Sequence, residues 1–163
     1  MTQPKFDSTL YRPNVGLALF SKAGHVFIGR RVNGRGPFQW QMPQGGIDDG
    51  ESAVTGALRE LEEEIGVPAK LVDVLEETPD WLHYEFPPDL KKRLPGPFHG
   101  QRQKWFALRF TGEDSEVNLH PPGHSQEFDQ WRWAPMGEVL DLIVPFKRQV
   151  YEQVIAEFRH LGA

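Results

Sequence analysis

Three glutamates, Glu60, Glu63 and Glu64, stand at a spacing that suits the binding of a metal ion. In a helix, which turns by about 100° per residue, they fall within one narrow arc. Like charges three and four residues apart repel, so such an arc favours a counter-charge. A hard divalent cation such as Mg²⁺ prefers oxygen ligands and keeps several of its waters. The alternative is a solvated acidic face, although no Lys residues alternate with these glutamates.

The helix that must position these glutamates has recognisable ends. Ser52 is a suitable N-cap, and Gly66 followed by Pro68 is a stop signal. An apolar stripe at helical spacing lies on the other side of the helix and consists of Val54, Leu58, Leu61 and Ile65. Gly45 and Gly46 precede the helix in a tight turn, where a backbone carbonyl can also approach a cation.

Composition and charge exclude several classes of protein. The 163 residues, 39% of them hydrophobic, suffice for one globular domain with its own core. No apolar window of about 18 residues predicts a membrane span, and the first residues lack the apolar region of a signal peptide. The absence of cysteine excludes disulfides and thiol catalysis and agrees with a cytoplasmic location. A net charge of −5 argues against a protein that coats nucleic acid, but not against one that grips a single phosphorylated end.

Alternating apolar residues predict a series of strands around this helix. The strands are expected over residues 14–20, 25–32, 38–42, 71–77, 81–86, 103–111 and 128–134, with a further short strand near 117–119. A short helix is expected over 135–142 and a final helix from Pro145 to about Leu161. Residues 87–100 read as a proline-rich loop, and residues 1–10 as a flexible N-terminus. The pattern predicts a single α/β (α+β) domain over residues 1–163, with a mixed β-sheet core between α-helices.

The stretch from Gly45 to Val67 resembles the Nudix box and matches it at every defined position. These positions are Gly45, Glu51, Arg59, Glu60, Leu61, Glu63, Glu64, Gly66 and Val67. The resemblance implies the Nudix fold and a hydrolase of nucleoside diphosphates linked to another moiety. It also implies that Glu60, Glu63 and Glu64 bind a divalent cation, Mg²⁺ or a substitute such as Mn²⁺. Glu51 is then the partner of Arg59 in a supporting ion pair.

Motifs outside the box resemble the bacterial RNA pyrophosphohydrolase branch of that family, whose members are also described as dinucleoside polyphosphate hydrolases. The motifs are YRPNVG at 11–16, WQMPQGG at 40–46, GQRQKWF at 100–106, EFDQWRW at 127–133 and VPFKR at 144–148. The resemblance implies that Glu127 is a further metal ligand or the general base, with Glu63 and Glu64 as alternatives for the base. It implies RNA contacts at Arg12, Arg31, Val144, Phe146 and Lys147.

These contacts make chemical sense for a phosphorylated RNA end. Arginine forks onto phosphate oxygens, and Phe146 can stack on a base. Lys104 and the basic run at 91–93 can attract the phosphate tail. The alternatives are that Phe146 belongs to the core of the last helix and that Lys104 belongs to a solvated basic face. For the five tryptophans we favour core packing over base binding.

Together these observations predict a Mg²⁺-dependent hydrolase that removes pyrophosphate from the 5′-triphosphate end of RNA, leaves a 5′-monophosphate and so initiates mRNA decay. A bound cation would polarise phosphoryl oxygens and lower the pKa of a water. The alternative among hydrolases is a diadenosine polyphosphate (Ap4A or Ap5A) hydrolase. The alternative outside them is a module that senses a nucleotide without hydrolysis. No membrane association is expected, and no protein partner can be inferred.

Overall fold

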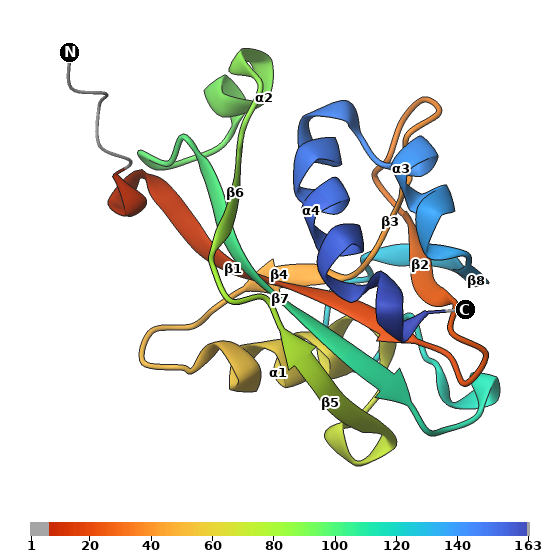
Figure 1. The fold of residues 1–163 in the computed structure, drawn as a ribbon. Coiled ribbons are helices and arrows are strands. Elements are labelled where there is room, and N and C mark those ends of the chain that lie inside the picture. Colours follow the sequence, from red (N-terminus) through yellow and green to blue (C-terminus); the bar gives the residue numbers. More distant parts are fainter. Residues whose placement is uncertain (1–6, 163) are drawn as a thin grey trace.

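The computed structural model describes residues 7–162 and centres on two long parallel strands (Figure 1). Strand β1 (Tyr11–Phe20) pairs with β7 (Gly100–Phe110), from Tyr11 opposite Gly100 to Phe20 opposite Arg109. Gly16 lies against Trp105 because a Cβ at position 16 would come within 2.2 Å of the indole. Two segments that lie far apart in the sequence are therefore joined along one long strand pair.

The other strands extend this pair on both sides. The sheet order is β3 (Trp40–Gln41), β2 (Val26–Arg31), β1, β7 and β5 (Val72–Glu77). Off this path, β4 (Gln44–Gly46) pairs with β1, β6 (Leu82–Glu85) with β7, and β8 (Phe128–Ala134) with β2. All of these pairings are antiparallel except that of β1 with β7. The sheet is therefore mixed, as predicted.

Helices cover both faces of the sheet (Figure 1). Helix α1 (Ala53–Ile65) packs on one face, over a core that includes Leu17, Leu61 and Phe106. Helices α3 (Val139–Leu142) and α4 (Arg148–Phe158) pack on the other, over Trp105 and Tyr151. Helix α2 (Pro88–Arg93) lies beyond the end of β6. The predicted class, a mixed sheet between helices, is confirmed. No helix in residues 7–162 has the length and apolar character needed to cross a membrane.

The predicted ends of α1 are confirmed, but its buried side differs from the predicted stripe. The Ser52 hydroxyl accepts from the Thr55 N–H at 3.3 Å, and Gly66 ends the helix at φ +70°, where a side chain would be strained. Leu61 and Ile65 are buried as predicted. Leu58 is partly buried against the same core, whereas Val54 is 39% exposed and Ala53, the residue before it, packs against the core instead.

Several predicted boundaries were wrong for local reasons. Residues 44–46 form β4 instead of a turn, because their backbone pairs with residues 14–16 of β1. The proline-rich stretch holds the six-residue helix α2. Residues 117–119 are not a strand: the Asn118 N–H donates to the Ile65 carbonyl at the end of α1, while Val117 and Leu119 pack into the α1-side core. The strand expected over 38–42 is shortened to Trp40–Gln41.

The two ends of the chain also differ from expectation. The final helix is a 3₁₀ turn (Pro145–Lys147), the α-helix α4, and a second 3₁₀ turn (Arg159–Leu161). Part of the predicted flexible N-terminus, Ser8–Leu10, forms a 3₁₀ turn, and the Thr9 N–H of this turn donates to the Asp7 side chain at 3.0 Å. Residues 1–6 of that prediction lie outside the described residues.

Candidate active site

The second half of α1 presents its glutamates to a hollow that the loop before β8 completes. Glu60, Glu63 and Glu64 line it together with Glu127 and two neighbours, His124 and Ser125. An adjoining hollow of about 300 Å³ shares Glu60, Glu64 and Glu127, and Gly45, Gly46 and Arg12 form part of its wall. Its size is at the lower end of the range for small-molecule sites. The structure thus brings together five of the predicted metal ligands, Gly45 included.

Glu64 is the buried member of this group. Its side chain is 7% exposed, and within residues 7–162 its Oε2 has no hydrogen-bond partner. Burial raises the pKa of Glu64 well above its ordinary value, and the nearby charges of Glu60 and Glu127 raise it further. The Gln44 backbone and Lys147 act in the opposite direction. A buried carboxylate oxygen without a partner is costly, so this position favours a proton or a cation.

Arg59 connects the glutamates to the loop before the helix. Its Nε and Nη2 donate to the two carboxylate oxygens of Glu51, each at 2.9 Å, and Nη2 also donates to the Gly46 carbonyl at 2.8 Å. Its Nη1 donates to Glu60 and to Glu63, each at 3.0 Å. Hydrogen bonds from Arg59 lower the pKa of Glu51 to about 2. The Glu51–Arg59 ion pair expected from the box is therefore present, and it anchors the residue 45–46 backbone against α1.

The donor set fits a hard divalent cation. Gly45 lies so close to Glu60 that a Cβ there would come within 2.1 Å of the Glu60 carboxyl carbon. Carboxylate and backbone carbonyl oxygens are the ligands that Mg²⁺ and Mn²⁺ take in proteins. As the side chains stand in residues 7–162, no three acidic or histidine residues are arranged to hold an ion. Glu60 and Glu63 converge instead on Nη1 of Arg59, so both would have to turn towards Glu64 to share a cation.

We expect Glu51→Gln to lower the melting temperature by several degrees and kcat/KM by about tenfold. The amide keeps one acceptor for Arg59 but loses the charge that holds the guanidinium in place. Thermal melts and rates measured side by side test this. If Glu51 were instead a direct ligand of the cation, kcat/KM would fall as far as it does in Glu64→Gln, and the melting temperature would change little.

Among the predicted substrate contacts, Arg12 reaches the hollow directly. It is exposed on β1, and its guanidinium lies over Gly46, where a Cβ would meet Nη2 at 2.9 Å. No hydrogen bond or ion pair to it is present within the described part of the chain. An unpaired guanidinium at the wall of an acidic hollow is suited to a phosphate.

Lys147 and its neighbours lie behind the hollow. Lys147 is buried, its Nζ donates to Gln41 at 3.2 Å, and Gln41 lines the larger hollow. Burial lowers the pKa of Lys147 to about 7; Arg31 also lowers it, whereas Glu64 raises it. Arg31 itself donates to the Phe38 carbonyl at 2.9 Å. A phosphate in the hollow would favour the charged form of this lysine.

Phe146 and Val144 are half-buried against the core of α4, so the packing alternative holds for part of each side chain. The Phe146 ring lies 5.6 Å from that of Tyr84, whose hydroxyl bonds Gln101 on the wall of the larger hollow. Phe146 is therefore connected to the site through the ring of Tyr84.

Lys104 does not reach the site. Side chains alternate along β7, so Lys104 lies on the face opposite Gln101, which lines the hollow. Its ammonium donates to the backbone carbonyls of Thr78 and Pro79, each at 3.0 Å. Lys104 therefore supports the backbone before β6 and is not positioned to contact a substrate in the hollow.

Four amide side chains line the hollow without having been predicted: Asn14, Gln41, Gln44 and Gln101. Each of these residues lies in a motif quoted above. The neighbouring sequence, however, does not indicate on which face of the sheet the amide side chain lies. Of the tryptophans, Trp105 is fully buried, and Trp131 stacks on Phe27 with centroids 5.1 Å apart, so packing is confirmed for these two.

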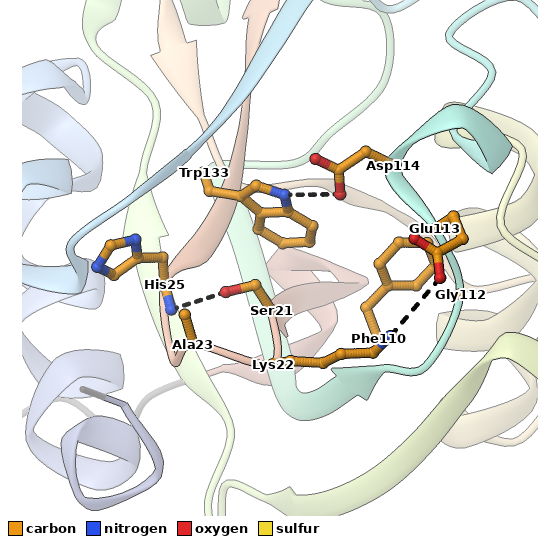
Figure 2. Close-up of a pocket in the computed structure, with 9 residues that line it drawn as sticks. All are labelled: Ser21, Lys22, Ala23, His25, Phe110, Gly112, Glu113, Asp114 and Trp133. Atoms are coloured by element: carbon orange, nitrogen blue, oxygen red, sulfur yellow. Dashed lines mark hydrogen bonds and ion pairs between the residues drawn. The ribbon is translucent and has the colours of Figure 1, made fainter.

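A separate hollow of about 260 Å³ lies at the opposite end of β1, between the turn at Ser21–His25 and the end of β7 (Figure 2). Its polar groups are bonded to one another. Trp133 donates to Asp114 at 3.1 Å, and Lys22 lies 4.0 Å from Glu113. None of the predicted catalytic, metal-binding or substrate-binding residues lines it, so we place the candidate active site at α1.

Comparison with known proteins assigns the chain to a family. The family model of the NUDIX domain matches residues 10–154. This chain is a member of the NUDIX family. It is 52% identical over 166 aligned positions to the RNA pyrophosphohydrolase of Brucella abortus, covering 96% of this chain and 92% of that one. The protein of that name from Brucella anthropi is also 52% identical, over 96% and 94% of the two chains.

Solved structures of other proteins share the fold at low sequence identity. The Escherichia coli dihydroneopterin triphosphate pyrophosphohydrolase superposes with a TM-score of 0.70 and is 19% identical, over 91% of this chain and 99% of that one. A Caenorhabditis elegans Ap4A hydrolase superposes with a TM-score of 0.63 and is 20% identical, over 90% and 98%. At this identity the likeness concerns the fold alone.

Proposed function

We propose that this NUDIX protein is a Mg²⁺-dependent pyrophosphohydrolase that removes pyrophosphate from the 5′-triphosphate end of RNA and leaves a 5′-monophosphate. The observation that carries the proposal is the shared hollow, where buried Glu64 meets Glu60, Glu127 and Arg12. Within residues 7–162, Oε2 of Glu64 has no hydrogen-bond partner, and Arg12 has neither a hydrogen bond nor an ion pair. Carboxylates that hold a cation and an arginine that holds phosphate are what cleavage of a phosphoanhydride needs. The Brucella relatives, which are named RNA pyrophosphohydrolase, support RNA as the substrate.

In the proposed mechanism, different residues of this chain bind the cation and accept the proton of the water. The cation, when bound, neutralises phosphate charge and makes a water acidic. Glu60, Glu63, Glu64 and the Gly45 carbonyl are the proposed ligands, with Glu127 as a further ligand. Glu127 is also a candidate base: it is exposed at the hollow, where it can take the proton of the attacking water. Glu63 and Glu64 remain the alternatives for that role.

Binding of the RNA end is assigned to the basic and aromatic residues around the hollow. Arg12 binds phosphate oxygens at the wall of the larger hollow. Lys147 donates to Gln41, which also lines this hollow, and adds positive charge behind it. Arg31 supports the positive potential beside Lys147. Phe146 offers a ring for a base, and Val144 packs against the same core. A cytoplasmic location remains a prediction from the sequence.

The decisive experiment compares rates of Mg²⁺-dependent hydrolysis of triphosphorylated RNA and of diadenosine tetraphosphate under the same conditions. We expect pyrophosphate from the RNA and a higher kcat/KM on it. A clear preference for the dinucleotide would replace the proposal with the dinucleoside polyphosphate alternative. Binding of both without release of phosphate products would indicate a sensor.

Phe146→Ala is expected to weaken RNA binding by about 1–3 kcal/mol, the usual contribution of one base stacked on an aromatic ring. The salt dependence of binding should stay the same because no charge is removed. Since the ring also contacts Tyr84 and the core, the melting temperature should fall by a few degrees. Titration at several salt concentrations, with a melt of each sample, measures both effects. A lower melt with unchanged binding would assign Phe146 to the core alone.

A further inference from the structure

Two buried residues of the last helical segment, one turn apart, reach the same part of the chain beside the larger hollow. Lys147 ends the 3₁₀ turn before α4, and Tyr151 lies four residues later, on the same side of the helix. The Lys147 Nζ donates to Oε1 of Gln41 at 3.2 Å. The Met42 N–H donates to the Tyr151 hydroxyl at 3.0 Å. Both bonds therefore hold the chain where β3 ends.

The bond from Met42 also fixes the backbone of Gln41. The Met42 N–H belongs to the planar peptide unit that joins the two residues, so the Tyr151 hydroxyl fixes the Gln41 carbonyl group as well. The pairing of β3 with β2 ends at Gln41, since β3 is only two residues long. Met42 is fully buried, so without the hydroxyl its N–H would lose a partner where water cannot replace it.

The Tyr151 hydroxyl is itself held in a fixed place. Its ring packs edge-on against Trp105, with centroids 5.4 Å apart, and the Trp105 indole N–H donates to Gln103 at 3.0 Å. Burial raises the pKa of Tyr151 above its ordinary value, so the hydroxyl stays uncharged. Tyr151 lines neither of the two active-site hollows. It can therefore affect a substrate only through the residues that it holds.

Gln41 connects this helix to the larger hollow. It is 7% exposed and lines the hollow together with Arg12. A lysine ammonium can only donate, so Lys147 bonds the amide oxygen of Gln41 and leaves the amide nitrogen as a donor. An amide nitrogen and an ammonium side by side are suited to anionic phosphate oxygens. A change in the backbone of Gln41 would separate these two donors.

We propose that Tyr151 is a positioning residue for the substrate phosphates, and that it acts by holding Gln41 between Lys147 and the larger hollow. The inference rests on the proposed function and deepens it. The Tyr151 hydroxyl fixes the backbone of Gln41, and Lys147 fixes its side chain. The amide nitrogen then faces a phosphate oxygen, with the charge of Lys147 next to it. Loss of the hydroxyl releases the peptide unit, and the two donors lose their alignment.

The test compares two variants that lose the same kind of hydrogen bond. Tyr151→Phe removes the hydroxyl and keeps the ring. Thr78→Val is the matched control, because Thr78 is 1% exposed and its Oγ1 accepts from the Trp105 N–H at 3.1 Å. Each variant leaves one buried backbone N–H without its side-chain acceptor, but Thr78 lines neither active-site hollow. We expect both to melt several degrees below the wild type and to stay folded at the assay temperature.

Kinetics separate a positioning role from a structural one. At saturating Mg²⁺, Tyr151→Phe should raise the KM for triphosphorylated RNA by about tenfold and keep kcat within about twofold of the wild type. The Mg²⁺ concentration that gives half the maximal rate should stay the same, because the proposed cation ligands are unchanged. Binding of triphosphorylated RNA in EDTA, measured by fluorescence anisotropy, should weaken by the same factor as the KM rises. Thr78→Val should match the wild type in all these measurements.

A double-variant cycle tests whether Tyr151 acts through Gln41. Gln41→Ala should itself weaken RNA binding in EDTA, and adding Tyr151→Phe to it should change binding by less than about twofold. A full tenfold loss from Tyr151→Phe in the Gln41→Ala protein would overturn the proposal. Unchanged binding and KM in Tyr151→Phe, or an equal loss in Thr78→Val, would also overturn it.

The same measurements distinguish this proposal from the proposed function. If the wild-type protein releases no pyrophosphate from RNA while its binding of RNA depends on Tyr151 and Gln41, the proposed function fails and the positioning role stands. If RNA is hydrolysed and Tyr151→Phe changes neither KM nor binding, the positioning role fails and the proposed function stands.

Discussion

Glu64→Gln is expected to lower kcat/KM on triphosphorylated RNA by roughly two to four orders of magnitude. Glu64 is the buried carboxylate at the junction of the two hollows, and its Oε2 has no partner within residues 7–162. The amide keeps the shape of the side chain but loses the charge that a cation requires. Saturating Mg²⁺ should not restore the rate, because the loss concerns the geometry of the bound cation as well as its affinity.

Glu62→Gln is the matched control for this variant. It makes the same chemical change two residues earlier on the same helix, but Glu62 is exposed and does not line either hollow. We expect its rate to stay within about twofold of wild type, as for a typical surface substitution. Near-normal turnover in Glu64→Gln, with Glu62→Gln also normal, would remove Glu64 from the proposed metal site.

The same variant should stabilise the metal-free protein at neutral pH. The pKa of Glu64 is raised in the folded state, so the folded protein holds this proton more tightly than the unfolded chain does. Above the ordinary glutamate pKa, the free energy of unfolding therefore falls as pH rises, until the raised pKa is passed. Glu64→Gln removes this contribution. Urea unfolding in EDTA at several pH values measures it, and a variant less stable than wild type at pH 7 would contradict the sign.

Gly45→Ala is expected to lower kcat/KM by about a hundredfold with little loss of stability. The new methyl group would come within 2.1 Å of the Glu60 carboxyl carbon, so this carboxylate must move. The moving group is the far end of a flexible side chain, which keeps the cost to folding small. A displacement of about 1 Å at a reacting centre can cost about a hundredfold in rate. Kinetics and a thermal melt of the same preparation test both parts.

Two other glycines provide controls for this prediction. Nothing lies within 4 Å of a Cβ at Gly137, so Gly137→Ala should leave the rate unchanged. At Gly46 the three atoms nearest to the Cβ would all belong to the Arg12 guanidinium, with Nη2 at 2.9 Å, so Gly46→Ala should raise KM more than it lowers kcat. A Gly45→Ala enzyme with the rate of Gly137→Ala would show that the position of Glu60 does not limit the reaction.

The sequence by itself determined the features that depend on neighbours along the chain. The ends of α1 are local, because Ser52 caps the N–H three residues on and Gly66 accommodates a left-handed backbone. The spacing of Glu60, Glu63 and Glu64 on one side of α1 follows from helix geometry alone. The Glu51–Arg59 pair, eight residues apart, came from the box motif and is present at 2.9 Å. The mixed sheet and β8 were predicted from alternation in short runs.

Only the tertiary structure decided which of these residues meet and which are buried. Glu127 reaches α1, and Arg12 reaches Gly46, through strand pairings between distant segments that no local pattern encodes. In the folded protein Val54 of α1 is exposed, whereas Glu64 is buried. The register of β7 turns Gln101 towards the hollow and Lys104 away from it. A shift of one residue in a strand reverses every such side chain, so the side of the sheet on which a residue acts is a property of the folded protein.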